Sequence, residues 1–202
     1  MTFGGINMTT KESIIHTTKE LLKTRTNLTI KDITEASNIN VAAVNYYFGS
    51  KDNLVNIVLK EAITELKVKI YEELLIPNDD TGKPGNTELM INKAVDLIYG
   101  FAEEYIGVIY LSFIGSEGQG NSTNILVNEF VTDTAFLEKL FEVFREITGI
   151  NDPLKLTAKY VILFSSFSVP LFLRSVIPNV TNAKFKEYKD AYIKELVKVF
   201  TN

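Results

Sequence analysis

The sequence has no cysteine, no tryptophan and a single histidine among its 202 residues. Without cysteine, the chain can form neither a disulfide framework nor a thiolate metal site, and it has no cysteine nucleophile. One histidine excludes a metal site made of several histidines. Any catalytic dyad or triad based on histidine would have to use His16, which we expect on the exposed face of a helix. These absences exclude several large classes of enzyme and metalloprotein.

Long apolar runs and cofactor motifs are also missing. The longest uncharged stretch in the second half of the chain, residues 160–173, is shorter than the roughly 20 residues of a membrane-spanning helix. The first ten residues have neither the basic nor the apolar segment of a signal peptide. The glycine-rich stretch 115–120 lacks the Lys-Ser/Thr ending of a phosphate-binding loop. We therefore expect a cytoplasmic protein with no cofactor and no membrane association.

The charge is unevenly distributed along the chain. The formal net charge is −4, so the protein as a whole is not a polybasic nucleic-acid binder. Residues 1–54 carry six basic and five acidic side chains, whereas the remainder carries 15 basic and 20 acidic ones. A slightly positive N-terminal segment thus precedes an acidic body.

Apolar residues recur at helical spacing over most of the chain. This pattern predicts an all-α fold with helices at 10–25, 30–37, 41–47, 51–75, 88–105, 123–148, 153–174 and 183–200. Turn-forming residues gather at 77–86, 115–124 and 177–182, which we predict to be loops. Pro170 lies inside the helix predicted at 153–174, and we expect it to kink or end that helix.

Residues 29–54 have the pattern of two short helices joined by a tight turn. Thr29 can cap the first helix, Asn38 can adopt the left-handed conformation that ends it, and Asn40 can cap the second. The side chains that we expect to face the interior are Ile30, Ile33, Ala36, Val44 and Phe48. Because a longer helix precedes this pair, the arrangement is a helix-turn-helix. Its second helix has a small, partly apolar outer face that can enter a major groove and read base edges: Val41, Ala42, Asn45 and Tyr46.

The segment resembles the N-terminal domain of TetR/AcrR-type transcriptional regulators. The matching features, in chain order, are Thr29, Ile33 with Ala36, the turn 38–40, the aromatic run 46–48, and Gly49-Ser50-Lys51-Asp52 followed by Leu54. The similarity extends from about Lys11 to Leu59. The rest of the chain resembles the family only in its length and helical character. The resemblance implies a helix-turn-helix DNA-binding domain at 1–54 and a helical effector-binding and dimerisation domain at 55–202.

The resemblance also assigns roles to individual residues of the N-terminal domain. It implies contacts with DNA phosphates for Thr29, Tyr47 and Lys51, and contacts with bases for Val41, Ala42, Asn45 and Tyr46. Lys51 stands at the start of the helix predicted at 51–75, where the helix dipole also favours an anion. The segment 40–48 departs from the family pattern because it has no charged residue.

The resemblance further implies an effector pocket and a dimer in the body of the protein. The aromatic candidates for an apolar pocket are Phe101, Tyr105, Tyr110, Phe113, Phe164 and Phe167, although core packing explains any one of them better. The helices predicted at 153–174 and 183–200 are too apolar to face water on every side and would pair with their copies. The function implied is a ligand-responsive repressor. It would bind a near-palindromic double-stranded operator as a homodimer and be released by a small apolar or aromatic effector.

Two other functions stay open on the sequence. One is an enzyme or small-molecule carrier built on a helical bundle. The single histidine, the absence of cysteine and the lack of any metal or nucleotide motif weigh against it. The other is a family member that has lost DNA binding and acts through protein contacts, which the uncharged segment 40–48 leaves open.

Overall fold

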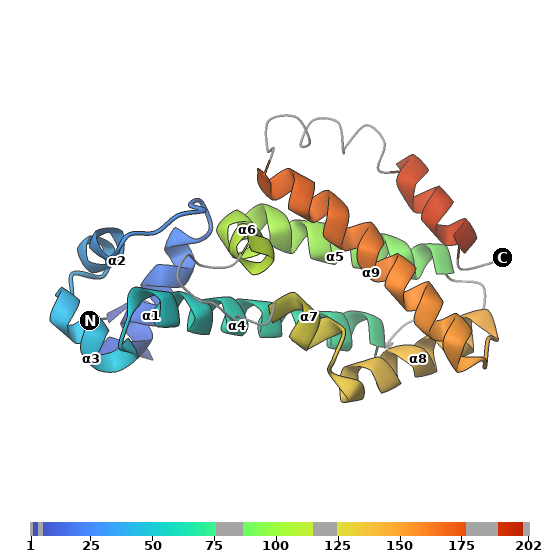
Figure 1. The fold of residues 1–202 in the computed structure, drawn as a ribbon, viewed down its shortest axis with the longest axis horizontal. Helices are drawn as coiled ribbons and strands as arrows, with labels where there is room; N and C mark the ends of the chain where they lie inside the picture. The colour runs from blue at the N-terminus through green and yellow to red at the C-terminus, as the bar shows by residue number, and fades with distance from the viewer. Residues whose placement is uncertain (1, 4–5, 76–86, 115–124, 177–189, 200–202) are drawn as a thin grey trace. The chain divides into compact units, whose positions relative to one another are not determined.

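A computed structural model describes residues 2–3, 6–75, 87–114, 125–176 and 190–199 (Figure 1). Two short strands, β1 (Thr2–Phe3) and β2 (Ile6–Asn7), pair antiparallel at the N-terminus. The helices are α1 (Thr10–Leu21), α2 (Ile30–Ser37), α3 (Val41–Phe48), α4 (Lys51–Ile70), the π-helical turn η1 (Tyr71–Leu75), α5 (Thr87–Glu104), α6 (Ile106–Ile114), α7 (Ile125–Phe130), α8 (Thr134–Thr148) and α9 (Pro153–Val176). Residues 190–199 form a final helix. The all-α prediction is confirmed. The predicted loops 77–86, 115–124 and 177–182, and residues 183–189 and 200 of the last predicted helix, lie outside the described residues.

The chain divides into two compact units. The first unit consists of Met1–Thr64 and Glu104–Leu126, and the second of Glu65–Glu103 and Val127–Asn202. The DNA-binding domain predicted at 1–54 lies within the first unit, which also includes part of α4 and all of α6. Helix α4 contributes residues to both units.

The first unit has its own apolar core. Helix α1 packs on α2, and α2 packs on α3. The fully buried side chains at its centre are Ile14, Leu22, Ile33, Val44, Leu54 and Val58. One expected interior residue is wrong: Ala36 is exposed, whereas the neighbouring Ser37 is buried. Ser37 can be buried because its hydroxyl donates to the carbonyl of Ile33, at 2.7 Å, within its own helix.

The second unit contains a helix break that the sequence pattern did not predict. The single helix expected at 123–148 is two helices, α7 and α8, separated at residues 131–133. Asp133 begins α8, because its carboxylate accepts the backbone N–H of Phe136 at 3.0 Å. The same carboxylate pairs with Lys67, which also lies 3.1 Å from Glu129. A half-buried lysine with two acidic partners therefore fixes the corner, and helical periodicity alone carries no sign of it.

Pro170 does not end α9, which continues to Val176. A proline inside a helix has no N–H for the carbonyl four residues earlier, which here belongs to Ser166. The hydroxyl of Tyr192, in the helix 190–199, donates to that carbonyl. A partner from another helix therefore satisfies the acceptor that the proline leaves open. Of the two alternatives expected at Pro170, a kink or an end of the helix, the end is wrong.

Candidate nucleic-acid interface

The turn between α2 and α3 is held by local hydrogen bonds. Thr29 and Asp32 form a reciprocal capping box at the start of α2. Asn38 ends α2 in the left-handed conformation, with φ 53° and ψ 40°. The side chain of Asn40 then begins α3 by accepting the N–H of Ala43 at 2.8 Å. These three expected roles, for Thr29, Asn38 and Asn40, are confirmed.

Helix α3 has one buried and one exposed face. Val44 is fully buried and Phe48 is 3 % exposed, so both side chains anchor the helix in the core of the first unit. The opposite face is open: Val41 is 44 % exposed and Tyr46 is 82 % exposed. Ala42 and Asn45 are exposed as well. The structure thus brings the four residues predicted to face bases onto the accessible side of one helix.

The connection from α3 to α4 is short and well bonded. Gly49 ends α3 with φ 74°, a conformation that disfavours residues with a Cβ. Ser50 begins α4 by accepting the N–H of Asn53 at 3.1 Å, and the Asn53 side chain donates to the carbonyl of Phe48 at 2.8 Å. Lys51, the first residue of α4, lies 3.4 Å from the carboxylate of Asp52. Its ammonium is therefore partly neutralised in the DNA-free protein.

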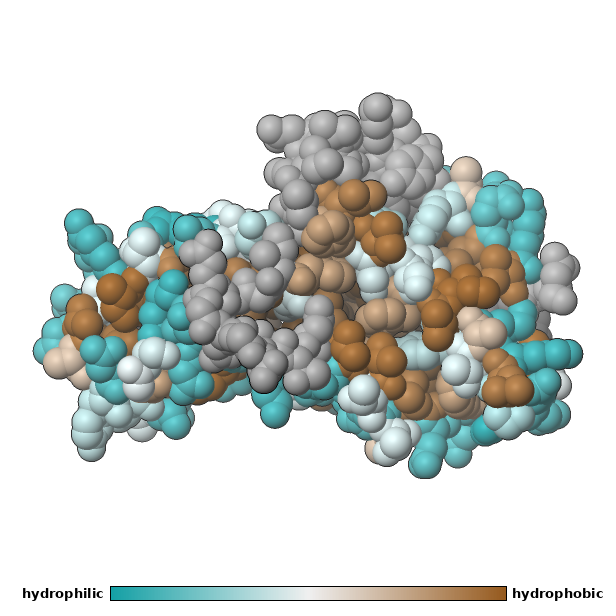
Figure 2. Space-filling model, viewed as in Figure 1, coloured by the Kyte–Doolittle hydropathy of each residue, from teal (hydrophilic) through white to brown (hydrophobic). Residues whose placement is uncertain are grey.

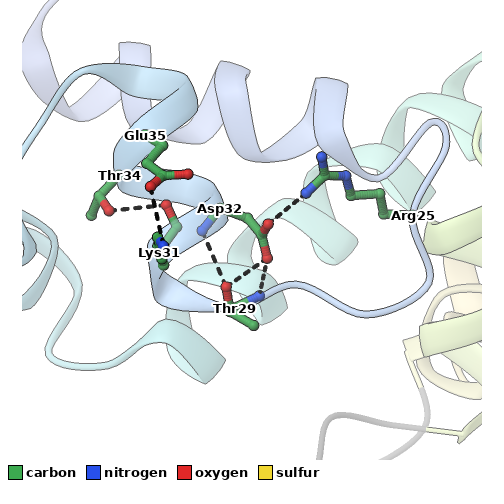
Figure 3. Close-up of polar contacts among 6 residues, drawn as sticks. All are labelled: Arg25, Thr29, Lys31, Asp32, Thr34 and Glu35. Atoms are coloured by element: carbon green, nitrogen blue, oxygen red, sulfur yellow. Dashed lines mark hydrogen bonds and ion pairs between the residues drawn. The ribbon is translucent and has the colours of Figure 1, made fainter.

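A polar network surrounds the N-terminus of α2 (Figure 3). The hydroxyl of Thr29 donates to the carboxylate of Asp32 at 2.6 Å and accepts the Asp32 N–H at 3.1 Å. Arg25, in the connection between α1 and α2, donates to the other carboxylate oxygen of Asp32 at 2.6 Å. The hydroxyl and backbone N–H of Thr29, together with Arg25, lower the pKa of Asp32 below its usual value. The sequence interpretation missed the Arg25–Asp32 pair, which joins a connecting segment to a helix.

Residues 14–58 match the family described as bacterial regulatory proteins, tetR family. The N-terminal domain is a TetR-family DNA-binding domain. The protein is accordingly a DNA-binding transcriptional regulator, and the resemblance found on the sequence is confirmed over this segment. No curated protein matches the chain.

The TetR-family domain makes a close contact with the corner between α5 and α6. The N–H of Gly107 donates to the carbonyl of Leu22 at 2.9 Å. A Cβ at position 107 would lie only 1.9 Å from the carbonyl oxygen of Arg25, so a side chain cannot be accommodated without movement. The ammonium groups of Lys19 and Lys23 lie 5.6 and 5.2 Å from the ring centroid of Tyr105. No signal in the sequence points to this contact, because its two sides are far apart in the chain.

The six aromatic pocket candidates are divided between the two units. Tyr105, Tyr110 and Phe113 are half-buried residues of the first unit. In the second unit, Phe101 and Phe167 are buried and Phe164 is half-buried, with its ring 6.2 Å from that of Tyr160. Their role in binding an effector stays a prediction.

Two further properties bear on the choice of function. Among the residues that the structure describes, no group of three or more histidine, aspartate or glutamate side chains could hold a metal ion. Within the described residues, the helix over Pro153–Leu173 is long and apolar enough to cross a membrane, with a mean hydropathy of 1.6. It coincides with the helix predicted at 153–174, of which the uncharged stretch 160–173 is a part. Length and composition alone are weak evidence for a membrane span, since buried helices of soluble proteins share them.

Proposed function

We propose that the protein is a cytoplasmic repressor that binds a near-palindromic operator as a homodimer and leaves it when a small apolar effector binds. The observation that carries the proposal is the exposed, uncharged face of α3, held rigidly by the buried side chains of Val44 and Phe48. A helix presented in this way can lie in a major groove with its N-terminal residues against base edges. We assign no enzymatic activity to the chain.

The phosphate contacts proposed for Thr29, Tyr47 and Lys51 differ in what they require. Tyr47 is 41 % exposed, and its ring packs edge-on against Tyr46 with centroids 5.1 Å apart. Lys51 has to exchange its neighbour Asp52 for a phosphate. The hydroxyl of Thr29 has to break its hydrogen bond to the Asp32 carboxylate before it can donate to a DNA phosphate. Lys51 is therefore the clearest test, because its replacement leaves the cap of α2 intact.

The exposed face of α9 supports the proposed dimer. Exposed residues follow one another along this face in alternating steps of four and three, which is the spacing of a helix–helix seam. They are residues 158, 162, 165, 169 and 172. Figure 2 shows hydrophobic surface along this helix. The opposite face packs against the chain itself, with Leu156, Tyr160 and Phe167 buried. A lipid bilayer would have to surround the helix, whereas a second copy has to cover only the open face. We therefore propose a dimer through 153–174 and 183–200.

The proposed effector would act through α4. This helix begins at Lys51 beside α3 and continues into the second unit, so a change in its tilt would alter the spacing of two α3 helices in a dimer. Two half-sites one DNA turn apart require about 34–36 Å between these helices. An effector that favours one tilt by a few kcal/mol would weaken operator binding, and operator DNA would weaken effector binding equally. The residues proposed to contact it are among the six aromatic candidates.

The decisive experiment is selection of bound sequences from a pool of random duplex DNA on the full-length protein. We expect enrichment of a two-fold symmetric site. Lys51→Ala should then weaken binding to all sequences alike and reduce the slope of log affinity against log salt by about one for each protomer. Lys60→Ala, an exposed lysine further along α4, is the matched control and should leave the slope nearly unchanged. Absence of any enriched sequence would refute DNA recognition.

The dimer has its own test in sedimentation. We expect a dimer at micromolar concentration, and a monomer for Val169→Glu, because a charge in the centre of the seam has to be desolvated on association. Val127→Glu, on the exposed face of α7, should remain dimeric. A wild-type protein that sediments as a stable monomer would exclude the proposed assembly.

A further inference from the structure

The exposed face of α3 has an unusual chemical inventory for a helix that reads DNA. It offers the apolar side chains of Val41 and Ala42, the amide of Asn45 and the ring of Tyr46. Between Asn38 and Ser50 the sequence has no lysine, arginine, aspartate or glutamate. The face therefore carries methyl groups, one amide and the phenol ring of Tyr46, and no lysine, arginine or carboxylate side chain.

Base pairs differ in what they require from a protein in the major groove. Guanine is most often read by arginine or lysine, and cytosine by a carboxylate. Adenine is read by an asparagine or glutamine amide, and the C5 methyl group of thymine by apolar side chains. The groups present on α3 match adenine and thymine. The lysine, arginine or carboxylate groups that most often read guanine and cytosine are missing from it.

The positions of these residues on α3 suit neighbouring base pairs. Asn45 lies three residues after Ala42 and four after Val41, so its side chain is a neighbour of both on the helix surface, with Cβ atoms roughly 5–6 Å away. Val41 and Ala42 belong to the first turn, the part of a recognition helix that contacts base edges. The cap by Asn40 and the burial of Val44 and Phe48 fix the direction in which this turn points.

A competing cation within the helix-turn-helix is Lys31 on α2, whose side chain is 79 % exposed. It is the one lysine or arginine between Thr29 and Ser50, and its ammonium lies 3.6 Å from the carboxylate of Glu35 (Figure 3). Lys31 is on α2 and not on α3. A guanine that it contacts would therefore lie in a base pair outside the set that α3 covers.

We infer that the operator half-site has a core of A·T pairs, in which Val41 and Ala42 contact thymine methyl groups and Asn45 binds an adenine. This inference rests on the proposed function, since it requires α3 to lie in the major groove. It goes further by naming the bases and the chemical group, the thymine methyl, by which the protein recognises them.

The test replaces thymidine by deoxyuridine, one position at a time, in the duplex selected from the random pool. The substitution removes only the C5 methyl group and keeps base pairing. We expect one or two positions in each half-site at which it weakens binding by about fourfold, the equivalent of one buried methyl group. For Val41→Ala, the same substitution should have a smaller effect at one of these positions, because the protein group that contacts the methyl is shortened.

Controls separate this coupling from a general loss of affinity. Val68 on α4 is 47 % exposed, close to the 44 % of Val41, so Val68→Ala is a matched substitution outside α3. It should show the full effect of deoxyuridine. Asn45→Ala should lose about tenfold or more in discrimination at one adenine and leave the deoxyuridine effect intact.

The outcomes distinguish this inference from the function on which it rests. A selected half-site whose core pairs are G·C would overturn the inference and leave DNA recognition standing. The same holds if deoxyuridine has no effect at any core position, or an equal effect in wild type and Val41→Ala. If no sequence is enriched, the proposed function fails, and the inference fails with it.

Discussion

Gly107 provides the sharpest test of how the TetR-family domain is held to the rest of its unit. Its N–H donates to the carbonyl of Leu22, and its Cα lies so close to the backbone of residues 22–25, directly after α1, that no side chain fits. In Gly107→Ala, the new Cβ would be 1.9 Å from the carbonyl oxygen of Arg25 and 2.7 Å from that of Leu22. Both obstacles are backbone atoms, so a change of rotamer cannot relieve the overlap. Helix α6 has to move away from α1.

The size of the effect follows from three contributions. Loss of the Gly107–Leu22 hydrogen bond costs about 1 kcal/mol. Overpacking of a well-filled contact costs about 1–3 kcal/mol. Alanine offsets this by at most about 1 kcal/mol through its higher helix propensity. We therefore expect Gly107→Ala to lower the free energy of unfolding by about 1–4 kcal/mol. The pairing of Lys23 with Glu104, at 3.3 Å, would be lost in the same movement.

The measurement is denaturant unfolding at one fixed protein concentration, because the proposed dimer would make stability depend on concentration. Gly100→Ala is the matched control. Gly100 lies in α5, is exposed, and has open space where a Cβ would be placed. Its replacement should stabilise the protein by up to about 1 kcal/mol. If Gly107→Ala were as stable as wild type, or shifted in the same direction as Gly100→Ala, the close contact between α6 and the segment 22–25 would be refuted.

Three further predictions concern two helix ends and the half-buried Ser166 carbonyl. Asn38→Ala should destabilise the protein by about 1 kcal/mol, while Asn38→Gly should equal or exceed wild type, because position 38 is left-handed; thermal unfolding of both variants tests this. Asp32 has a pKa lowered mainly by Thr29, so its stabilising effect is present above about pH 4 and is lost as the pH falls through its folded-state pKa. The difference in unfolding free energy between wild type and Asp32→Ala should therefore shrink towards pH 2, and a constant difference would argue against the network. Tyr192→Phe should cost about 1–2 kcal/mol in denaturant unfolding, because the Ser166 carbonyl loses the donor that replaces the missing proline N–H, and an unchanged midpoint would contradict that pairing.

The helix-turn-helix is the part of the fold that the sequence predicted in most detail. Thr29, Asn38 and Asn40 act where they were expected, because each cap is a contact over three or four residues. The buried positions Val44 and Phe48 and the exposed positions Val41 and Tyr46 also follow from the helical repeat of α3. Ala36 was misplaced because a small side chain gives little driving force for burial, and Ser37 could take the interior position with an internal hydrogen bond.

The sequence by itself determined what depends on neighbours along the chain: the helical repeat, the caps and the left-handed turn at Asn38. Only the tertiary structure decided where distant segments meet. The corner at Asp133 depends on Lys67, and the continuity of α9 past Pro170 depends on Tyr192. The fit of α6 against the segment 22–25 depends on the missing side chain of Gly107. Each is a single contact between residues far apart in the sequence. Because such a contact leaves no periodic trace in the amino acids on either side, it becomes visible only when the chain has folded.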